Sequence, residues 1–297
     1  MNLLVTVGVC VRNSTSTLPD AIKSIIEQDF SHKQMEVIFV DDGSTDGTLS
    51  MLKKYASRMD IATSIYSFRW QGLGPSRNVV MNNAKGKYIV WVDGDMMLPS
   101  DHIRKQVMFM ERNPNVGIAK ARYGTLLGEK SVATLENISD IVEDALAGNY
   151  WEEEAKLPGS GGSIYRVEAV KRIGGFDDKI KGVGEDQDVA YRVRAAGWVL
   201  SRSEAVFFER RENTWKALWS KYFWYGYGNY ALYSKNRGVF SLYRMVPPAS
   251  FIIGLFYAVI ALRIAHSLVF ILLPFHFGFK STAWLFGFVR GQFMWTH

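Results

Sequence analysis

The sequence predicts an α/β fold, with a mostly parallel sheet and helices on both of its faces. The main observation is that strand-like apolar runs alternate with helical segments through the first 92 residues. A second observation narrows the class. No Gly-x-Gly-x-x-Gly or Walker loop follows any of these runs, which argues against dinucleotide enzymes and nucleoside triphosphatases.

Local signals predict the individual elements. Strands are expected at residues 3–11, 35–40, 61–68 and 88–92. A first helix is expected from Leu18, with Ser16 or Thr17 as its N-cap and Pro19 in its first turn. Two further helices are expected, one ending near Ser57 and one at about 76–84. The section 116–208 is more mixed, with a Gly-rich stretch at 158–162, a short strand near 163–165 and a helix that opens at 184–186.

The second half of the chain differs in composition from the first. We expect a folded α/β domain at residues 1–212, an aromatic and basic interfacial region at 213–246, and a hydrophobic membrane-associated tail at 247–297. The net charge of the chain is +6. Residues 210–297 hold ten Lys or Arg against one acid, which is +9, so residues 1–209 sum to −3. A basic, aromatic tail beside an apolar run indicates membrane lipids as partners and no nucleic acid.

The tail can meet a membrane in more than one way. A helix rich in Trp and Tyr is expected from about 214 to 234, either in the headgroup layer or packed on its own domain. The 25 residues between Pro248 and Pro274 have only Arg263 and His266 as ionisable groups. At about 1.5 Å per residue they are long enough to cross a hydrocarbon core of about 30 Å. Either one spanning helix or a re-entrant pair broken near Arg263 fits, and a buried soluble helix fits the flanking aromatics less well. The run 283–295 is too short to span and is expected to lie along the interface.

The N-terminal half indicates the compartment. Cys10 is the only cysteine, so no intrachain disulfide can form, which fits a reducing compartment. The chain enters a strand-like run with no preceding basic segment, and we expect no signal peptide. The localisation predicted is the cell membrane, with the α/β domain on its cytoplasmic face.

An acidic triplet, Asp93-Gly94-Asp95, ends the strand expected at 88–92. A buried strand cannot also bury two unpaired carboxylates, so both acids should emerge at its carboxyl end, where open α/β sheets bind ligands. One or two carboxylates together with substrate phosphate oxygens commonly hold Mg²⁺ or Mn²⁺. A plain Asp-Gly turn is the structural alternative.

Three other polar motifs each have a structural and a functional interpretation. Asp41 and Asp42 could cap a turn and helix, or Asp42 could accept a hydrogen bond from the N3–H of a uracil-like base. Arg77, beside Asn78, could form a salt bridge at a helix start, stack on a nucleobase or pair with a phosphate. Glu185 and Asp186 could favour the dipole at a helix start, or Asp186 could be a general base.

Six motifs in this order resemble glycosyltransferase family 2: Val-Asp-Asp-Gly-Ser (40–44), Arg-Asn (77–78), Asp-Gly-Asp (93–95), Gly-Ser-Gly-Gly-Ser (159–163), Gly-Gly-Phe-Asp (174–177) and Gly-Glu-Asp-Gln-Asp (184–188). The resemblance covers roughly residues 3–236. It implies a GT-A fold, a nucleotide-sugar donor and inversion at the anomeric carbon.

The resemblance also implies roles by position. Asp42 would contact the base, Asp95 would hold the metal, and Asp93 would reach the ribose or the metal. Asp186 would be the base, with Glu185 shaping its surroundings. The remaining nucleotide-sugar positions would be Asp41, Arg77, Asn78, Val11 and Asn13. The acceptor side would be lined by Gly161, Gly162 and Ser163.

The acidic pair bears on the acceptor. A phosphate is ionised at neutral pH and needs no base, so Asp186 favours a hydroxyl on a lipid-linked or polysaccharide acceptor. Two alternatives remain: transfer to a polyprenyl phosphate, and a non-catalytic nucleotide-sugar-binding membrane subunit. The intact acidic set argues against the second of these.

Overall fold

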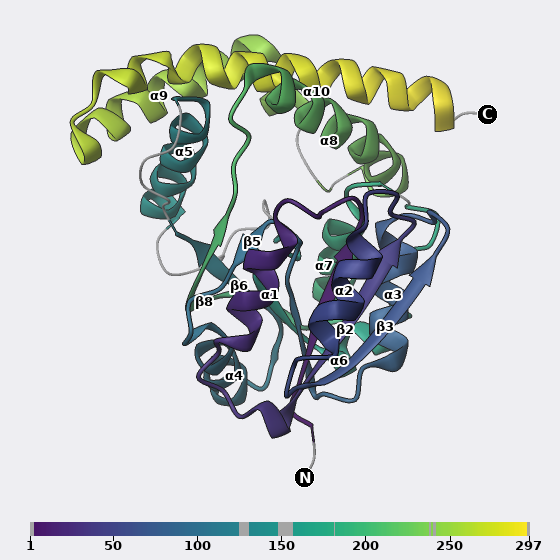
Figure 1. Cartoon of the computed structure of the whole chain (residues 1–297). Helices are drawn as coiled ribbons and strands as arrows, with labels where there is room; N and C mark the ends of the chain where they lie inside the picture. Colours follow the sequence, from purple (N-terminus) through teal and green to yellow (C-terminus); the bar gives the residue numbers. More distant parts are fainter. Residues whose placement is uncertain are drawn as a thin grey trace. The chain divides into compact units, whose positions relative to one another are not determined.

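The computed structural model describes residues 3–124, 131–147, 157–180, 182–237, 239 and 242–295. Figure 1 shows the course of the chain. Its strands are β1 (Val5–Val11), β2 (Met35–Asp42), β3 (Ala62–Phe68), β4 (Tyr88–Trp91), β5 (Met96–Met97), β6 (Val116–Tyr123), β7 (Ser163–Arg166) and β8 (Val199–Glu209). Its α-helices are α1 (Leu18–Ile26), α2 (Thr48–Ala56), α3 (Leu73–Asn83), α4 (His102–Arg112), α5 (Ser131–Ala147), α6 (Val167–Arg172), α7 (Glu185–Ala195), α8 (Trp215–Lys235), α9 (Pro247–Ala265) and α10 (Leu273–Trp295).

Contacts divide the chain into two compact units. The first comprises residues 1–124, 157–181 and 185–209, and the second comprises 125–156, 182–184 and 210–297. The second unit therefore takes α5 from the middle of the sequence as well as the C-terminal helices. The three segments drawn from the sequence, 1–212, 213–246 and 247–297, are divided by composition and stay a prediction.

The first unit is built on one eight-stranded sheet with the order β3-β2-β1-β4-β7-β6-β8-β5. The pairs β3–β2, β2–β1 and β1–β4 are parallel, as the βα alternation predicts. β7 runs antiparallel to both β4 and β6, while β6 and β8 are again parallel. The second half of the sheet is therefore mixed, because β7 enters between β4 and β6 from a later part of the chain.

Helices cover both faces of this sheet. Every residue of β1 and β2 is buried, so neither face of these strands meets water. On one face, α1, α2 and α4 pack through Ile22, Leu52 and Ile103 in the main core cluster. On the other face, α3 packs so closely that a Cβ on Gly8 would lie 2.9 Å from Val80 Cγ1 and 2.7 Å from the ring of Trp91. The predicted arrangement of helices on both faces is confirmed.

Several boundaries differ from the expectation. α1 begins at Leu18 with Thr17 as its N-cap, but no side chain caps it. α3 begins at Leu73, three residues before the expected Ser76, because Gly72 with a φ of +101° redirects the chain there. The sequence did not resolve α4, which precedes the section 116–208 described above as mixed, or β6, α5 and β8, which lie in that section or at its end.

The second unit is helical. The apolar run between Pro248 and Pro274 is broken near Arg263, as one of the two alternatives has it, because α9 ends at Ala265 and His266 takes a left-handed conformation with a φ of 50°. The segment 283–295 is the second half of the 23-residue α10, and its position along a membrane interface stays a prediction. Two segments, 247–264 and 268–294, are long and apolar enough to cross a membrane.

The aromatic helix α8 packs within its own unit, which was the structural interpretation of its sequence. Trp219 meets Phe279 and Phe286 of α10 edge-on or tilted, with ring centroids 5.3 and 6.0 Å away. Thr214 caps α8, as its side chain accepts a hydrogen bond from Ala217 N. The ring contacts show that much of the aromatic content of α8 serves helix packing.

Candidate active site

The acidic turn after β4 lies where the strand order of the sheet reverses. β1 has β2 on one side and β4 on the other, whereas the chain visits β2 and β3 before it returns to β4. Ligands of open α/β sheets bind outside the carboxyl ends of the strands at such a switch point. Asp93 follows β4 by two residues, and a hydrogen bond of 3.1 Å from Met96 N to Asp93 O closes the turn. The tertiary structure thus puts the acidic triplet at the place where this class of sheet binds ligands.

Gly94 allows this turn to pack closely against the end of β1. A Cβ at Gly94 would lie 3.0 Å from Val11 Cγ1 and 3.1 Å from Ser14 Oγ. Val11 is buried and takes part in this contact. Asp93 and Asp95 on either side of Gly94 are both partly exposed. The glycine therefore lets the two carboxylates of the triplet sit beside β1.

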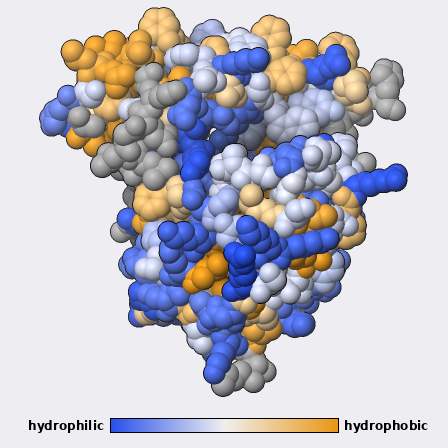
Figure 2. Space-filling model, in the orientation of Figure 1, coloured by the Kyte–Doolittle hydropathy of each residue, from blue (hydrophilic) through white to orange (hydrophobic). Residues whose placement is uncertain are grey.

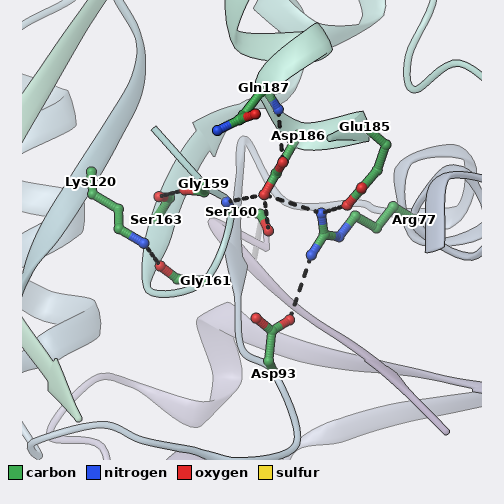
Figure 3. Close-up of polar contacts among 10 residues, drawn as sticks. All are labelled: Arg77, Asp93, Lys120, Gly159, Ser160, Gly161, Ser163, Glu185, Asp186 and Gln187. Carbon is green, nitrogen blue, oxygen red and sulfur yellow. Dashed lines mark hydrogen bonds and ion pairs between the residues drawn. The ribbon is translucent and has the colours of Figure 1, made fainter. Parts of the chain in front are cut away.

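Arg77 of α3 is the centre of an ion-pair cluster in the first unit (Figure 3). Its Nη1 is hydrogen-bonded to Glu185 Oε1 and lies 3.8 Å from Asp186 Oδ2. Its Nη2 lies 3.6 Å from Asp93 Oδ1. One guanidinium thus connects the acid after β4 with the two acids that begin α7. These residues are 77, 93, 185 and 186 in sequence, and the fold brings them together.

The guanidinium of Arg77 is buried, with 3% of the side chain exposed. Its Cζ lies 5.5 Å from the ring centroid of Trp91 and 5.8 Å from that of Phe176, within the range of cation–π attraction. A nucleobase therefore has no exposed face of Arg77 on which to stack. This geometry does not support the stacking role left open by the sequence, because these rings and carboxylates already surround the guanidinium; a role of Arg77 in binding the nucleotide sugar stays a prediction.

Burial sets the electrostatics of the cluster. The Glu185 side chain is only 1% exposed, and this burial raises its pKa to about 8, opposed by Arg77 and reinforced by Asp186. Burial also raises the pKa of Asp93, again opposed by Arg77. Without the guanidinium, three carboxylates in this region would repel one another and be poorly solvated. Arg77 thus opposes the effect of burial on the pKa of Glu185 and of Asp93.

Asp186 is held by the Gly-rich loop at 159–163. Its Oδ2 accepts hydrogen bonds from Ser160 N at 2.9 Å and Ser160 Oγ at 3.2 Å, and its Oδ1 accepts one from Gln187 N at 2.8 Å. A Cβ on Gly159 would lie 3.4 Å from Asp186 Oδ2. Asp186 is 17% exposed, compared with 1% for Glu185. Of the two acids, Asp186 is therefore the one that can meet a substrate.

The same loop reaches Asp93. A Cβ on Gly161 would lie 2.9 Å from Asp93 Oδ2 and 2.0 Å from Met96 Cε, so only glycine fits without displacement. Gly162 has a φ of +65°, and its N–H donates to Trp91 O at 3.0 Å. Ser163 Oγ donates to Gly159 O at 2.7 Å and closes the loop. The three residues predicted for the acceptor side, Gly161, Gly162 and Ser163, thus belong to a loop that contacts both Asp93 and Asp186.

Lys120 of β6 is a site residue that sequence reasoning missed. Its ammonium donates to the carbonyl of Gly161 and lies 4.6 Å from the ring centroid of Phe207 (Figure 3). The residue is 6% exposed. It also acts electrostatically on Asp93, whose pKa it lowers against the effect of burial. A lysine within the apolar run Val116–Tyr123 was the available signal, because a buried cation requires a partner.

The loops after β1 and β2 form a second group of polar residues. Asn13 has a φ of 51°, rare for a residue other than glycine. Its N–H donates to Ser44 Oγ at 2.9 Å, and its Oδ1 accepts from Thr45 N at 2.8 Å. Asp46, and neither Asp41 nor Asp42, accepts from the first turn of α2, at Thr48 N. Asn13 therefore ties the carboxyl ends of β1 and β2 together.

Asp42 and Asp41 are buried at the end of β2. Asp42 Oδ1 accepts from Gln71 N at 2.8 Å and Oδ2 accepts from Gly72 N at 3.0 Å. Asp41 Oδ2 accepts from Ser67 Oγ at 3.2 Å, while its buried Oδ1 has no hydrogen-bond partner among the described residues. Both carboxylates therefore organise the segment that leads into α3.

Asn78 does not join the Arg77 cluster. Its Nδ2 donates to Phe176 O at 2.8 Å and to Asp178 Oδ1 at 2.6 Å, and its Oδ1 accepts from Phe176 N at 2.8 Å. The Gly-Gly-Phe-Asp motif at 174–177 therefore binds back to α3. Asp188 forms an i,i+4 salt bridge with Arg192 at 2.7 Å within α7. The first interaction fixes the segment that precedes α7, and the second stabilises α7 itself.

A divalent cation fits this site only in a substrate-bridged form. Within the described parts of the chain, no three His, Cys, Asp or Glu side chains are grouped to hold a metal ion. Asp93 and Asp95 supply two carboxylates from one turn, and 35% of the Asp93 side chain is exposed. Mg²⁺ typically takes one or two carboxylates and completes its shell with water and substrate phosphate oxygens. The donor set therefore matches a hard cation that arrives with a diphosphate.

Comparison with known proteins agrees with this geometry. The profile of glycosyl transferase family 2 matches residues 6–174, which is more than half of the chain. Poly(ribitol-phosphate) β-N-acetylglucosaminyltransferase TarS from Staphylococcus aureus is 30% identical over 101 residues, covering 34% of this chain and 18% of TarS. The putative teichuronic acid biosynthesis glycosyltransferase TuaG from Bacillus subtilis is 33% identical over 98 residues, covering 33% of this chain and 38% of TuaG. The chain thus matches well under two thirds of the length of either relative.

A solved structure shows the same fold. Mannosyltransferase PcManGT from Pyrobaculum calidifontis, in complex with GDP-Man and Mn²⁺, superposes with a TM-score of 0.69 at 19% identity. The match covers 97% of this chain and 86% of that protein. The mixed sheet with helices on both faces is therefore a GT-A fold, as the motif order predicts. With the family profile covering most of the strands, the acidic turn and the Gly-rich loop, the chain belongs to glycosyl transferase family 2.

Proposed function

We propose that this chain is a metal-dependent inverting glycosyltransferase that moves a sugar from a nucleotide-diphosphate sugar to a hydroxyl group. The observation that carries the proposal is the cluster around Arg77. It joins Asp93, the acid at the ligand-binding edge of the parallel strands, with Asp186, the more exposed acid of α7. One side of this cluster suits a diphosphate and the other suits the removal of a proton. Family membership supports the same chemistry.

The donor would occupy the carboxyl ends of β1, β2 and β4. Asn13, with its left-handed backbone, and the buried Asp42 place polar atoms beside a nucleoside there. PcManGT is described in complex with GDP-Man, and TarS with UDP-GlcNAc, so both neighbours bind a nucleotide sugar. We infer that Asp42 meets the base through the loop it organises.

A divalent ion would be held by Asp95 and Asp93 together with the donor diphosphate. Such an ion supplies Lewis-acid stabilisation of the negative charge on a departing diphosphate. PcManGT is described in complex with Mn²⁺, which supports a divalent ion in this fold. Arg77 keeps Asp93 ionised by its proximity of 3.6 Å, since a nearby positive charge favours the charged form. Asp93 can then serve as a ligand at neutral pH.

Asp186 would act as the general base. Its Oδ2 is oriented by Ser160 N and Oγ, and its partial exposure allows contact with an acceptor hydroxyl. The carboxylate takes the hydroxyl proton while the oxygen attacks the anomeric carbon from the face opposite the leaving diphosphate. Attack in a single step inverts that carbon. A phosphate acceptor needs no such base, which is why a hydroxyl on a lipid-linked or polysaccharide acceptor is favoured.

The place of action would be the cytoplasmic face of the cell membrane. Two segments long and apolar enough to cross a bilayer support membrane association. The relatives named above are described as enzymes of poly(ribitol-phosphate) glycosylation and teichuronic acid synthesis. A lipid-linked or polymeric glycan is a substrate that such an enzyme would meet at a membrane.

The proposal is tested with Asp186→Asn and a panel of nucleotide sugars with Mn²⁺. The wild type should be thermally stabilised by one donor only when metal is present, since a ligand that binds the folded state raises its stability. Asp186→Asn should keep this stabilisation and lose transfer by about 100-fold or more. Full transfer activity in Asp186→Asn would point to a polyprenyl phosphate acceptor. An absence of donor-dependent stabilisation in the wild type would contradict the transferase itself.

A further inference from the structure

The two C-terminal helices of the second unit each expose an apolar face, and we call the residues of these faces the outer stripe. It comprises Ile252, Leu255, Phe256 and Val259 of α9 and Phe275, Phe286, Val289 and Phe293 of α10. Their exposure ranges from 43% to 71%. Within each helix, spacings of 3, 4, 7 and 11 residues place them on one face. Figure 2 shows apolar residues gathered over α9.

The opposite side of α10 is tightly packed on α8. A Cβ on Gly287 would lie 1.9 Å from Phe223 O, and one on Gly226 would lie 1.8 Å from Trp284 O. A Cβ on Gly291 would lie 2.9 Å from Tyr227 O. The two backbones therefore touch along their length and run in the same direction. α8 and α10 therefore keep their relative position when α10 meets a membrane. The exposed polar residues Lys216, Ser220 and Lys235 of α8 move with α10.

The acidic helix α5 packs under the turn between α9 and α10. Its Leu135 and Ile138 share a core cluster with Ala261 of α9 and with Phe270 and Leu273 at the turn. We call α9, the turn and α10 the hairpin. α5 is thereby attached to the end of the hairpin at which the chain reverses direction.

Buried charges fix α5 in that place. Glu136 Oε1 of α5 lies 2.7 Å from Lys280 Nζ and 3.0 Å from His276 Nε2 of α10, and its Oε2 accepts from Tyr222 of α8 at 3.2 Å. Asp140 of α5 pairs with Arg211. Opening this network would leave the buried carboxylate of Glu136 without its cation, Lys280, which is strongly unfavourable. α5, α8 and the hairpin therefore move as one body within the second unit.

These contacts bear on how the hairpin meets a bilayer. If α9 and α10 crossed the hydrocarbon core, the turn between them would reach the far side. α5 would then have to enter the core with Glu136, Asp140 and Glu143, where carboxylates are costly. If the hairpin lies along the surface, α5 and α8 stay in water and only the outer stripe enters the acyl layer. The packing is compatible with the second arrangement alone.

We propose that α9 and α10 form an in-plane membrane anchor, with the outer stripe immersed in one leaflet of an anionic bilayer. The inference rests on the membrane-attached transferase proposed above and specifies how it is attached. Charge selects an anionic bilayer over a second copy of the chain, because the second unit is basic as a whole: residues 210–297 sum to +9 and residues 125–156 to −6, which leaves +3, and two such units would repel each other. Arg263, exposed on the same face of α9 as Ile252 and Val259, would reach lipid phosphates from the edge of the stripe.

Depth measurements distinguish the arrangements. Nitroxide labels are placed on the full chain at Phe275→Cys, Phe286→Cys and Phe293→Cys, with Met108→Cys of α4 as a control that is 42% exposed in the native protein. Native Cys10 gives little background, since it is buried and burial raises its thiol pKa to about 12. The labels are read by oxygen and nickel accessibility on vesicles of phosphatidylcholine with phosphatidylglycerol.

The in-plane anchor predicts that the three labels on α10 lie at one depth and that Met108→Cys stays in water. A spanning α10 predicts a graded series, with 18 residues between the outer two labels, or about 27 Å at 1.5 Å per residue. Association through a second copy predicts labels shielded from lipid-phase oxygen that broaden one another. Either of these two results overturns the proposal.

Binding measurements test the surface and the lipid. The double variant Phe256→Glu/Phe293→Glu, at two of the most exposed residues of the stripe, should bind anionic vesicles at least about tenfold more weakly, and Met108→Glu should bind as the wild type does. Wild-type binding should fall by about tenfold or more on vesicles of phosphatidylcholine alone. Unchanged binding in the double variant, or equal binding to both vesicles, contradicts the anchor. Donor hydrolysis in detergent reports separately on the transferase, since the double variant should retain it.

Discussion

The guanidinium of Arg77 is hydrogen-bonded to the carboxylate of Glu185, 108 residues later in the chain. This buried pair joins α3 to the start of α7. It also leaves the second guanidinium nitrogen 3.6 Å from Asp93. The link between the donor side and the base side of the site thus depends on one side chain that is almost completely buried.

Replacing Arg77 should destabilise the protein more than replacing both members of the pair. Arg77→Leu leaves Glu185 buried without its partner, which should cost about 3–5 kcal/mol. Arg77→Leu/Glu185→Leu should recover a substantial part of that loss, while transfer activity stays low because Asp93 and Asp186 lose their common cation. Denaturant unfolding of both variants measures the difference. Equal destabilisation in the single and double variants would show that the pair does not carry this energy.

Gly161→Ala should impair transfer with little loss of stability. The added methyl would lie 2.9 Å from Asp93 Oδ2, whereas Met96 Cε, the other close atom, is the mobile end of a side chain. Displacing a carboxylate that positions substrate by about 1 Å can lower the rate about 100-fold. Steady-state kinetics with metal titration should show the loss. Gly278→Ala, whose methyl would meet only Phe251 at 3.8 Å, is the matched control and should be active.

Lys120→Met should shift the metal or donor requirement of the enzyme. The substitution keeps most of the apolar stem but removes the donor to Gly161 O and the charge that lowers the pKa of Asp93. We expect a higher KM for the donor and an activity profile displaced to higher pH, since Asp93 would ionise at a higher pH. Lys120→Arg should restore part of the wild-type profile. An unchanged pH profile in Lys120→Met would restrict Lys120 to a packing role.

Acid should destabilise the protein through His102. This residue is fully buried, its Nδ1 lies 2.7 Å from Val206 O, and burial lowers its pKa from 6.5 to about 4. The unfolded chain binds a proton on this histidine between those values and the folded chain does not. The contribution of His102 to the free energy of unfolding is therefore complete above pH 6.5. It falls by about 3 kcal/mol as the pH decreases towards 4.

The measurement is the free energy of unfolding at a series of pH values for the wild type and His102→Gln. The wild type should lose stability faster than the variant between pH 6.5 and 4. If the free energy of unfolding changed with pH equally in the wild type and in His102→Gln, His102 would not titrate as its burial requires.

The sequence alone was sufficient for the N-terminal strands, the helices between them and the family, while the roles of the proposed site residues stay predictions. The spacing of apolar residues and the positions of Gly and Pro are local properties of the chain. The strands Val5–Val11, Met35–Asp42 and Tyr88–Trp91 therefore lie close to where the pattern predicts them. The acidic triplet was also predictable, because charge cannot remain inside a buried strand. Its position at the switch point follows from the order of the strands.

The tertiary structure decided which of these residues contact one another. Arg77 was open to several roles until Trp91, Phe176 and three carboxylates were found around it. Lys120 gained its role from Gly161, 41 residues away. The tail could not be assigned from hydropathy, because a spanning helix and an in-plane helix share the same composition. Only the packing of α5 beneath the turn and α8 along α10 separates them, since such contacts depend on distant segments that no local pattern encodes.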